Sequence, residues 1–412
     1  MASALLDIND CTLSLWTEHG RVESPGYALL QGRDYRFGET ARASARLTPR
    51  NINNRYWWQL GTAPLQPALG PARHTADLVH AHLLQLHAEA GAPGSLAIAC
   101  PGSMSREQLS LLLGITQQCP FTVTALVDRS TLIGSLQPGA YHLELQLHQA
   151  LLTELVRTDG SVAAGSFTPL PGCGLLQLQE RLVAQIADAF IRQTRFDPRR
   201  QAHSEQALYD ALPTVLAALA GQGEYNFELG GHRARLSRSE LAAASARLVS
   251  AIRETIGERS ASLLLDPLPG ALPGLPEAFP GCNTPPPDSA WRAALELADH
   301  LHSDSGQFNL HDSLPDRAPA ATTSAARAAA TSPARPQPTH LLQGAVARPL
   351  GEEPVVLADG VVLQRQAQGW TVSGEAEVNR GAATPGQPLR SGDLIRVAGE
   401  EYRLIEVLAR GS

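Results

Sequence analysis

The sequence contains no lysine, so all 33 of its basic residues are arginine. Roles that require a lysine amine, such as a P-loop lysine, a Schiff-base lysine or the strand lysine of a protein kinase, are therefore excluded. Long apolar stretches are also missing, because no run reaches the roughly 18 residues that a membrane-spanning helix needs. No signal-peptide pattern is visible at the amino terminus. We expect a protein that does not insert into a membrane.

Paired cysteines are absent as well. The five cysteines are scattered and form no C-x-x-C pair, which predicts reduced, mostly buried thiols in a cytoplasmic protein. The net charge of −7 provides no electrostatic reason for nucleic-acid binding. At 412 residues, the chain has room for two or three domains and a sizeable core.

The stretch QPGAYHLELQLHQALLTELVRTDG, residues 137–160, carries the clearest pattern. Leu143, Leu145 and Leu147 alternate with polar residues, and the alternation resumes after a short turn until Asp159-Gly160. Period two on both sides of a break predicts a β-hairpin. A similar pattern opens the chain over residues 4–30, with a break at Gly20. Since helical sequence follows each hairpin, we interpret residues 1–302 as a duplicated α/β body with two lobes.

The rest of the chain changes character twice. Helical patterns are predicted over residues 39–47, 74–90, 106–113, 175–195, 204–219, 237–256 and 289–301. Residues 303–340 are rich in Ala, Pro, Ser and Thr, which predicts a flexible linker. Residues 341–412 contain short strand patterns separated by glycine turns and predict a small all-β, sandwich-like domain.

Several stretches follow one another in order: FGETARASARLTPRNINNR from residue 37, SLAIACPGSMSREQ from 95, GCGLLQLQERLVAQIADAFIRQTRFD from 172, LLLDPLPGALPGLPEAF from 263 and PDSAWRAALELA from 287. Together they resemble the nucleotide-binding domain of DnaK-type heat-shock chaperones, in the actin-like ATPase superfamily. The resemblance implies a two-lobed fold with a nucleotide cleft between its halves.

The chain departs from this family at the phosphate-binding loops. The family has glycines there because they let main-chain N–H groups approach the phosphates. The family's D-x-G-T-T is replaced by Asp7-Ile8-Asn9-Asp10-Cys11-Thr12, and its D-L-G-G-G-T by Glu144-Leu145-Gln146-Leu147-His148-Gln149. At the adenosine turn, Asp266-Pro267-Leu268-Pro269 replaces Gly-Gly-Ser, and proline has no N–H to donate.

A few polar residues remain at positions where the family contacts nucleotide. The resemblance implies Asp7, Thr12, Asp128 and Glu144 as nucleotide-binding residues if any nucleotide binds. Arg55 falls near the place of the family's catalytic lysine. We assign no catalytic residue and no metal site, and we expect no cofactor.

We interpret the body as a pseudo-ATPase that acts as a cytoplasmic scaffold or adaptor for other proteins. The alternative is a divergent ATPase that uses Asp7, Asp10 and Asp128 with Mg²⁺. The stretch VNRGAATPGQPLRSGDLIRVAGEEYRLIEV from residue 378 weakly resembles a forkhead-associated domain. That resemblance implies a second alternative, an adaptor that reads a phosphothreonine peptide through Asn379 and Arg390.

Two clusters outside these motifs have ordinary explanations. Four histidines, at positions 74, 80, 82 and 87, crowd one predicted helix without an acidic neighbour, so we expect a solvated helix rather than a metal site. The aromatic run from Tyr56 to Trp58 predicts either core packing or a partner-binding patch.

Overall fold

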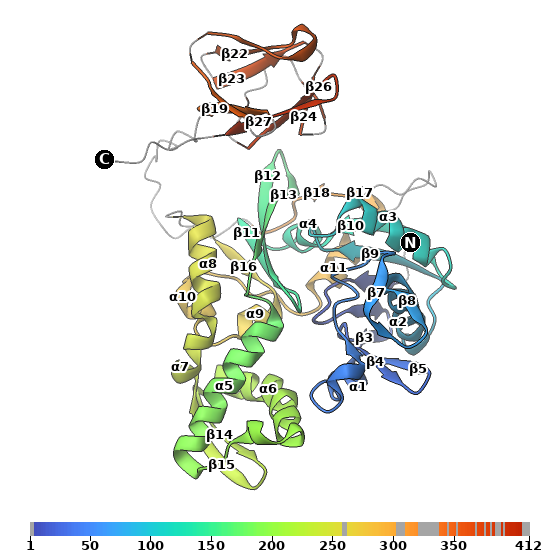
Figure 1. Ribbon diagram of the computed structural model, residues 1–412, viewed down its shortest axis with the longest axis vertical. Helices are drawn as coiled ribbons and strands as arrows, with labels where there is room; N and C mark the ends of the chain where they lie inside the picture. The colour runs from blue at the N-terminus through green and yellow to red at the C-terminus, as the bar shows by residue number, and fades with distance from the viewer. Residues whose placement is uncertain are drawn as a thin grey trace. The chain divides into compact units, whose positions relative to one another are not determined.

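The computed structural model divides into two compact units, residues 1–322 and 323–412 (Figure 1). The structure describes residues 4–257, 262–301, 310–319, 338–343, 346–351, 353–366, 369–374, 376–379, 381–383, 389 and 392–405. The chain is a mixed α/β protein. Within the described residues, no helix is both long enough and apolar enough to cross a bilayer. All five cysteines are free, and three of them are buried, as the scattered spacing predicts.

The first large sheet of unit 1, here sheet I, has the strand order β17-β10-β9-β1-β2-β3. Strands β1, β2 and β3 form an antiparallel meander, whereas β9 pairs parallel to β1, β10 to β9 and β17 to β10. The bounds are β1 (Ala4–Asp7), β2 (Ser14–Thr17), β3 (Gly20–Glu23), β9 (Ser95–Cys100), β10 (Thr122–Asp128) and β17 (Leu310–His311).

The second large sheet, sheet II, has the order β16-β11-β12-β13-β18. It also begins with an antiparallel meander, β11 to β13, and its β16 pairs parallel to β11. A parallel bridge between Leu264 and Asn283 extends it past β16. The bounds are β11 (Tyr141–Leu145), β12 (Ala150–Thr158), β13 (Ser161–Leu170), β16 (Leu263–Leu265) and β18 (Ser313–Pro315). The hairpin predicted over residues 137–160 is confirmed. In both sheets the first strand of the meander pairs parallel to a later strand, but β17 extends the parallel edge of sheet I, whereas β18 pairs antiparallel to β13 at the meander edge of sheet II.

Unit 1 continues beyond residue 302, where the change in composition predicts that it ends. Strands β17 and β18 lie after residue 302, inside the stretch interpreted as a linker, and they pair with β10 and β13. They are two and three residues long, too short to show a period-two pattern. Residues 303–309 and 320–337 of that stretch lie outside the described residues.

Helices and small sheets complete the unit. The helices are α1 (Glu39–Arg42), η1 (Pro49–Asn51), α2 (Thr75–Glu89), α3 (Arg106–Thr116), α4 (Arg129–Gly134), α5 (Leu175–Thr194), η2 (Pro198–Arg200), α6 (Ala202–Gln222), α7 (Arg238–Leu241), η3 (Ala242–Ser245), α8 (Ala246–Ile256), α9 (Pro267–Ala271), α10 (Leu275–Ala278), α11 (Ser289–Glu296) and α12 (Ala298–Leu301). The small sheets contain β4 (Ala28–Gln31), β5 (Asp34–Phe37) and β6 (Ile52–Asn53); β7 (Pro64–Leu69) and β8 (Ala72–His74); and β14 (Glu224–Leu229) and β15 (His232–Ser237).

Some predicted helices differ in extent. The helix predicted over residues 39–47 is only four residues long, and the one predicted over 237–256 is divided into α7, η3 and α8. Pro213, in contrast, lies within α6 without ending it.

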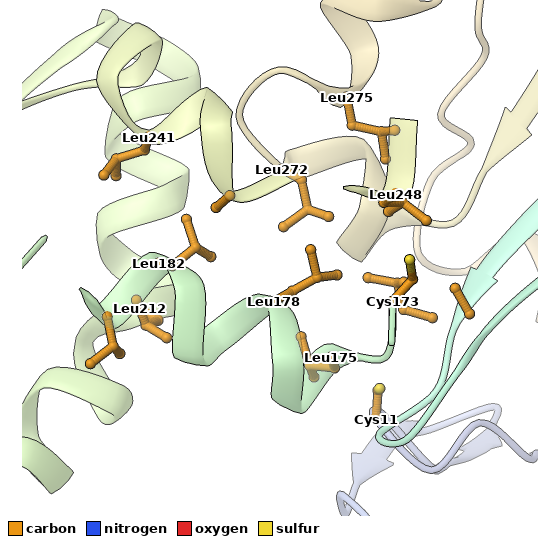
Figure 2. Close-up of a cluster of buried hydrophobic side chains, with 14 of the residues drawn as sticks. Cys11, Cys173, Leu175, Leu178, Leu182, Leu212, Leu241, Leu248, Leu272 and Leu275 are labelled. Carbon is orange, nitrogen blue, oxygen red and sulfur yellow. The ribbon is translucent and has the colours of Figure 1, made fainter. Parts of the chain in front are cut away.

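Helix α5 shows how one glycine positions a whole element. A Cβ on Gly174 would lie 2.4 Å from the carbonyl carbon of His148, so only glycine lets the helix begin against the β11–β12 turn. From there Leu178 and Leu182 extend into the core (Figure 2). In Figure 2 they meet leucines of α6, α7 and α8 and the segment around α9 and α10. The helix ends at Thr194, and the next residue, Arg195, has a left-handed φ of 64°.

Strand alternation divides the apolar side chains of unit 1 into three cores. Leu6 of β1 joins α2 and α3 on one face of sheet I, and Leu143 of β11 joins α5, α6 and α8 on the outer face of sheet II. The third core contains side chains of both sheets together with α4 and α11, including Leu5, Val127, Leu132, Leu155, Leu264 and Ala293. Alternate residues of β1 and β11 therefore point toward the region where the sheets meet.

Unit 2 is built from strands in its described residues, apart from the turn η4 (Ala358–Gly360). Its two antiparallel sheets have the orders β20-β19-β27-β26-β24-β25 and β21-β22-β23, and they share a core that includes Trp370, Ile395 and Leu404. The bounds are β19 (His340–Gln343), β20 (Val346–Pro349), β21 (Val355–Val356), β22 (Val362–Gln366), β23 (Gly369–Ser373), β24 (Glu377–Val378), β25 (Gly381–Ala382), β26 (Leu394–Val397) and β27 (Glu400–Ile405).

The packing around α5 predicts how much a cavity there lowers the free energy of unfolding. Leu178 is fully buried, so we expect Leu178→Ala to lower the free energy of unfolding by about 2–5 kcal/mol. Leu295 on α11 is 53% exposed, and Leu295→Ala should change it by less than about 0.5 kcal/mol. Urea unfolding followed by circular dichroism measures both, and equal losses would contradict the assignment of Leu178 to the core.

Candidate functional site

A buried arginine lies where the two sheets meet. The Arg129 Nε donates to Asp7 Oδ1 at 2.6 Å. Its Nη1 donates to Glu144 Oε2 at 3.0 Å and to Asp266 Oδ2 at 2.7 Å. All four side chains are buried. One guanidinium therefore contacts three carboxylates, which come from distant parts of the chain; we call this group the Arg129 cluster.

Strand ends bring these residues together. Asp7 is the last residue of β1, and Arg129 is the first residue of α4, directly after β10, so both belong to sheet I. Glu144 lies on β11 and Asp266 follows β16, so both belong to sheet II. Asp128 caps α4 by accepting a hydrogen bond from the Thr131 N–H at 2.8 Å. The Arg129 cluster thus links the two sheets directly.

A histidine supports Asp266 from the other side. The Nε2 of His142 is 2.9 Å from Asp266 Oδ1, and its Nδ1 is 2.9 Å from the Ser130 hydroxyl. An ionised carboxylate only accepts hydrogen bonds, so Nε2 carries a proton and donates it. His142 is completely buried. It therefore helps to hold Asp266 in the orientation that Arg129 requires.

Burial and charge act in opposite directions on this cluster. Burial disfavours the charged form of Asp266, but Arg129 and His142 outweigh it and lower its pKa to about 2. For Glu144, burial is the larger effect and its pKa is raised. Burial alone would lower the pKa of Arg129, but its three carboxylate neighbours raise it well above the usual value. Arg129 is therefore a permanent internal cation.

Asp10 lies beside this cluster without a cation of its own. Its Oδ1 accepts a hydrogen bond from the Leu147 N–H at 2.7 Å. Burial, with a smaller effect from the charge of Glu144, raises the pKa of Asp10 to about 7. Asp10 therefore keeps its proton at pH values at which an ordinary aspartate is ionised.

Two main-chain donors of the first loop, those of Cys11 and Thr12, are already used inside the protein. The Asn9 side-chain oxygen accepts from the Cys11 N–H at 3.0 Å, and its main-chain oxygen accepts from the Thr12 N–H at 2.9 Å. Asn9 is buried and forms the kind of turn in which an asparagine replaces a backbone acceptor. These N–H groups therefore have no free hydrogen for a phosphate.

The second loop is closed in the same way. The N–H of Gln146 donates to Gln149 O at 2.8 Å, and the N–H of Leu147 donates to Asp10. At the start of α5, the N–H groups of Leu175 and Leu176 donate to the carbonyls of Gln146 and Leu147. A helix amino terminus is a common phosphate site because these groups are free there. Here they are paired within the chain.

The remaining opening beside Arg129 is small. A cavity of about 180 Å³ is lined by Asp7, Thr12, Arg129 and Asp266, among others. Typical small-molecule pockets measure roughly 300–1,000 Å³. Among the described residues, no group of three or more His, Cys, Asp or Glu side chains has an arrangement suited to a metal ion.

Of the residues that the resemblance implies, Asp7 and Glu144 both contact Arg129, and Asp128 lies at the adjoining helix start. Thr12 is exposed at the cavity, whereas Arg55 is exposed and lines a separate groove. Arg55 and Asp7 therefore line different cavities.

The histidine-rich helix differs from the prediction of a solvated helix. His82 on α2 is fully buried and contacts the Ser24 hydroxyl at 2.7 Å, the Tyr56 hydroxyl at 2.8 Å and Trp57 Nε1 at 3.1 Å. Tyr56 and Trp57 belong to the core, whereas Trp58 is 40% exposed.

In unit 2, the amide of Asn379 is bonded within the protein, to Asp393 and to the Leu394 N–H. Arg390 lies outside the described residues. Phosphothreonine reading through these residues stays a prediction.

Arg129 and His142 were missed by reasoning from sequence alone. Arg129 follows a strand at a helix start, a position that is usually solvated. The available signal was on β11, where His142 and Glu144 alternate with buried leucines. A strand with both faces buried needs an internal partner for each polar side chain.

A comparison of the chain with protein-family models and with curated proteins finds no match to either. The interpretation of the site therefore depends on its geometry and on the resemblance of its motifs.

Removing the internal cation should be costly. We expect Arg129→Met to lower the free energy of unfolding by about 3–5 kcal/mol, because it leaves buried carboxylates without a partner. Arg292→Met removes an exposed pair with Asp288 and should cost less than about 1 kcal/mol. Chemical unfolding at pH 7 measures both variants, and a stable Arg129→Met protein would show that the cluster does not hold the sheets together.

Asp10 predicts a specific pH dependence. Its pKa is about 7 in the folded protein against an ordinary value of 3.8. Between these values the unfolded chain has released the proton and the folded chain retains it, so stability falls as pH rises, by up to ~1.4 kcal/mol per unit. Asp10→Asn should remove this contribution, so its advantage over the native chain should grow from about pH 4 to 7 and then level off. A constant difference, measured by urea unfolding with the exposed Asp188→Asn as control, would contradict the shift.

Proposed function

We propose that unit 1 is a degenerate DnaK-like, actin-like domain that has replaced nucleotide with an internal arginine and acts as a protein scaffold. The observation that carries the proposal is the guanidinium of Arg129, bonded to carboxylates of both sheets. In this interpretation the two sheets are the cores of two lobes. Arg129 then provides the contact across the cleft that a bound cation and nucleotide would otherwise supply.

The topology supports the proposed relationship. In each sheet, the first strand of a three-strand antiparallel meander pairs parallel to a later strand, which is β9 in sheet I and β16 in sheet II. The chain motifs that resemble the chaperone domain lie on the corresponding elements, including the turn before α5. The same order in both sheets is what a duplicated ancestral half would leave.

Electrostatics argues against a triphosphate in this cleft. Five buried carboxylates surround the region, and Arg129 already serves three of them. Charge-assisted hydrogen bonds contribute about 1.5–3 kcal/mol each, but the N–H groups that would form them here are paired internally. A nucleotide would therefore meet repulsion without compensating contacts.

A scaffold function suits a domain of this kind that is linked to a second unit. We therefore place the protein as an adaptor that contacts other proteins, with the divergent ATPase as the competing function.

Nucleotide titration tests this proposal. We expect no heat of binding and no rise in melting temperature with Mg·ATP, because a ligand that binds only the folded form must stabilise it. If the native chain bound Mg·ATP at micromolar concentration, and Thr12→Ala or Asp7→Asn weakened binding, the divergent ATPase would be the correct function. Thr12 is exposed, so Thr12→Ala tests contact with nucleotide without disturbing the core.

A further inference from the structure

A second cavity, of about 270 Å³, lies beside Asp10. Its walls come from both parts of unit 1: Trp57, Trp58 and Ser103 from the sheet I side, and Gln149 and Phe167 from the sheet II side. The Arg129 cluster does not line it. We propose that this cavity binds a single arginine side chain of a partner protein. This inference names a contact for the scaffold and rests on the proposed function.

The acidic wall calls for a cation. Among the described residues that line the cavity, Asp10 is the only one that ionises. Its side chain is buried, and the one side-chain hydrogen bond that it makes within the described residues uses Oδ1 and leaves Oδ2 without a donor. Glu144 lies behind it and adds negative charge. An unpaired buried carboxyl in a negative field favours a cationic partner.

The aromatic wall suits a flat cation. Trp58 is 40% exposed and stacks on His148, with ring centroids 5.2 Å apart. Phe167 is 43% exposed. Trp57 is held in place by its hydrogen bond to the buried His82. A guanidinium stacks on aromatic faces and keeps its N–H groups free for acceptors in its own plane.

Two polar side chains at the cavity, Gln149 and Ser103, can accept hydrogen bonds from a guanidinium. Gln149 donates its Nε2 hydrogen to Gln146 Oε1, which leaves its own Oε1 available to accept. The Ser103 hydroxyl accepts from Gln146 at 3.3 Å and has a second lone pair. Because arginine carries five donors and no acceptor, it matches this set better than a neutral side chain does. The volume lies below the roughly 300 Å³ of typical small-molecule pockets, which suits one side chain.

Peptide titration tests the inference. The probes are acetyl-Gly-Gly-X-Gly-Gly-amide peptides in which X is arginine, lysine or the neutral isostere citrulline, measured by isothermal titration calorimetry on the full chain. We expect the arginine peptide to bind at least about tenfold more tightly than the citrulline peptide. The lysine peptide should lie between them, because an ammonium has no planar fork.

Matched variants locate the site. Asp10→Asn keeps the acceptor for Leu147 and should weaken binding of the arginine peptide at least about tenfold. Trp58→Leu should weaken it several-fold, whereas the exposed Asp188→Asn should leave it unchanged.

Affinity for the arginine peptide should rise from about pH 6 to pH 8 as Asp10 ionises. The other titratable groups near Asp10 are Glu144, Cys11, Tyr27 and Tyr56. Burial raises the pKa of Cys11, Tyr27 and Tyr56, so these three stay neutral over this range.

Equal affinities for the arginine and citrulline peptides, unchanged binding to Asp10→Asn, or no binding of the arginine peptide at millimolar concentration would overturn this inference. A chain that binds neither Mg·ATP nor the arginine peptide would contradict only the arginine site. A chain that binds Mg·ATP would contradict the scaffold proposal itself.

Discussion

Unit 1 depends on one guanidinium. Arg129 starts from sheet I, reaches two carboxylates of sheet II and pairs with Asp7 of its own sheet. Buried carboxylates on facing strands repel one another unless a cation lies between them. The chain provides that cation covalently, so its supply does not depend on the concentration of any ligand. The two sheets are therefore joined whenever the protein is folded.

Main-chain N–H groups near Arg129 also find their partners within the protein. Asn9, Asp10 and the carbonyls of the β11–β12 turn each take an N–H group that would otherwise point into the opening. Such internal pairing favours a single arrangement of the loops, because each of these donors would lose its acceptor if the loops moved. A rigid opening of this kind can present a fixed surface to a partner, whereas a cleft that closes on nucleotide must change shape.

The sequence predicted the parts of this fold that depend on local periodicity. The alternation in residues 137–160 predicted β11 and β12, and the apolar spacing after Gly174 predicted α5. It did not predict Arg129 in the interior, because burial there arises only when two sheets, formed by distant segments, meet. His82 was expected in solvent for a similar reason: its partners, Ser24 and Tyr56, come from elsewhere in the chain. Long-range pairing of polar groups leaves little trace in local patterns, apart from polar residues on a strand such as β11 whose two faces are both covered.

The short strands β17 and β18 determine where the chain can be cut to obtain unit 1 alone. Strand β17 lies at an edge of sheet I, and β18 lies at an edge of sheet II. The N–H of the adjoining Arg317 donates to the Ser135 carbonyl. A protein cut at residue 302 would keep the helices described in unit 1 but leave β10 and β13 with unpaired edges, which favours strand addition from other copies. Strands β17 and β18 thus cover one edge of each sheet, and a first unit that is produced separately has to retain them.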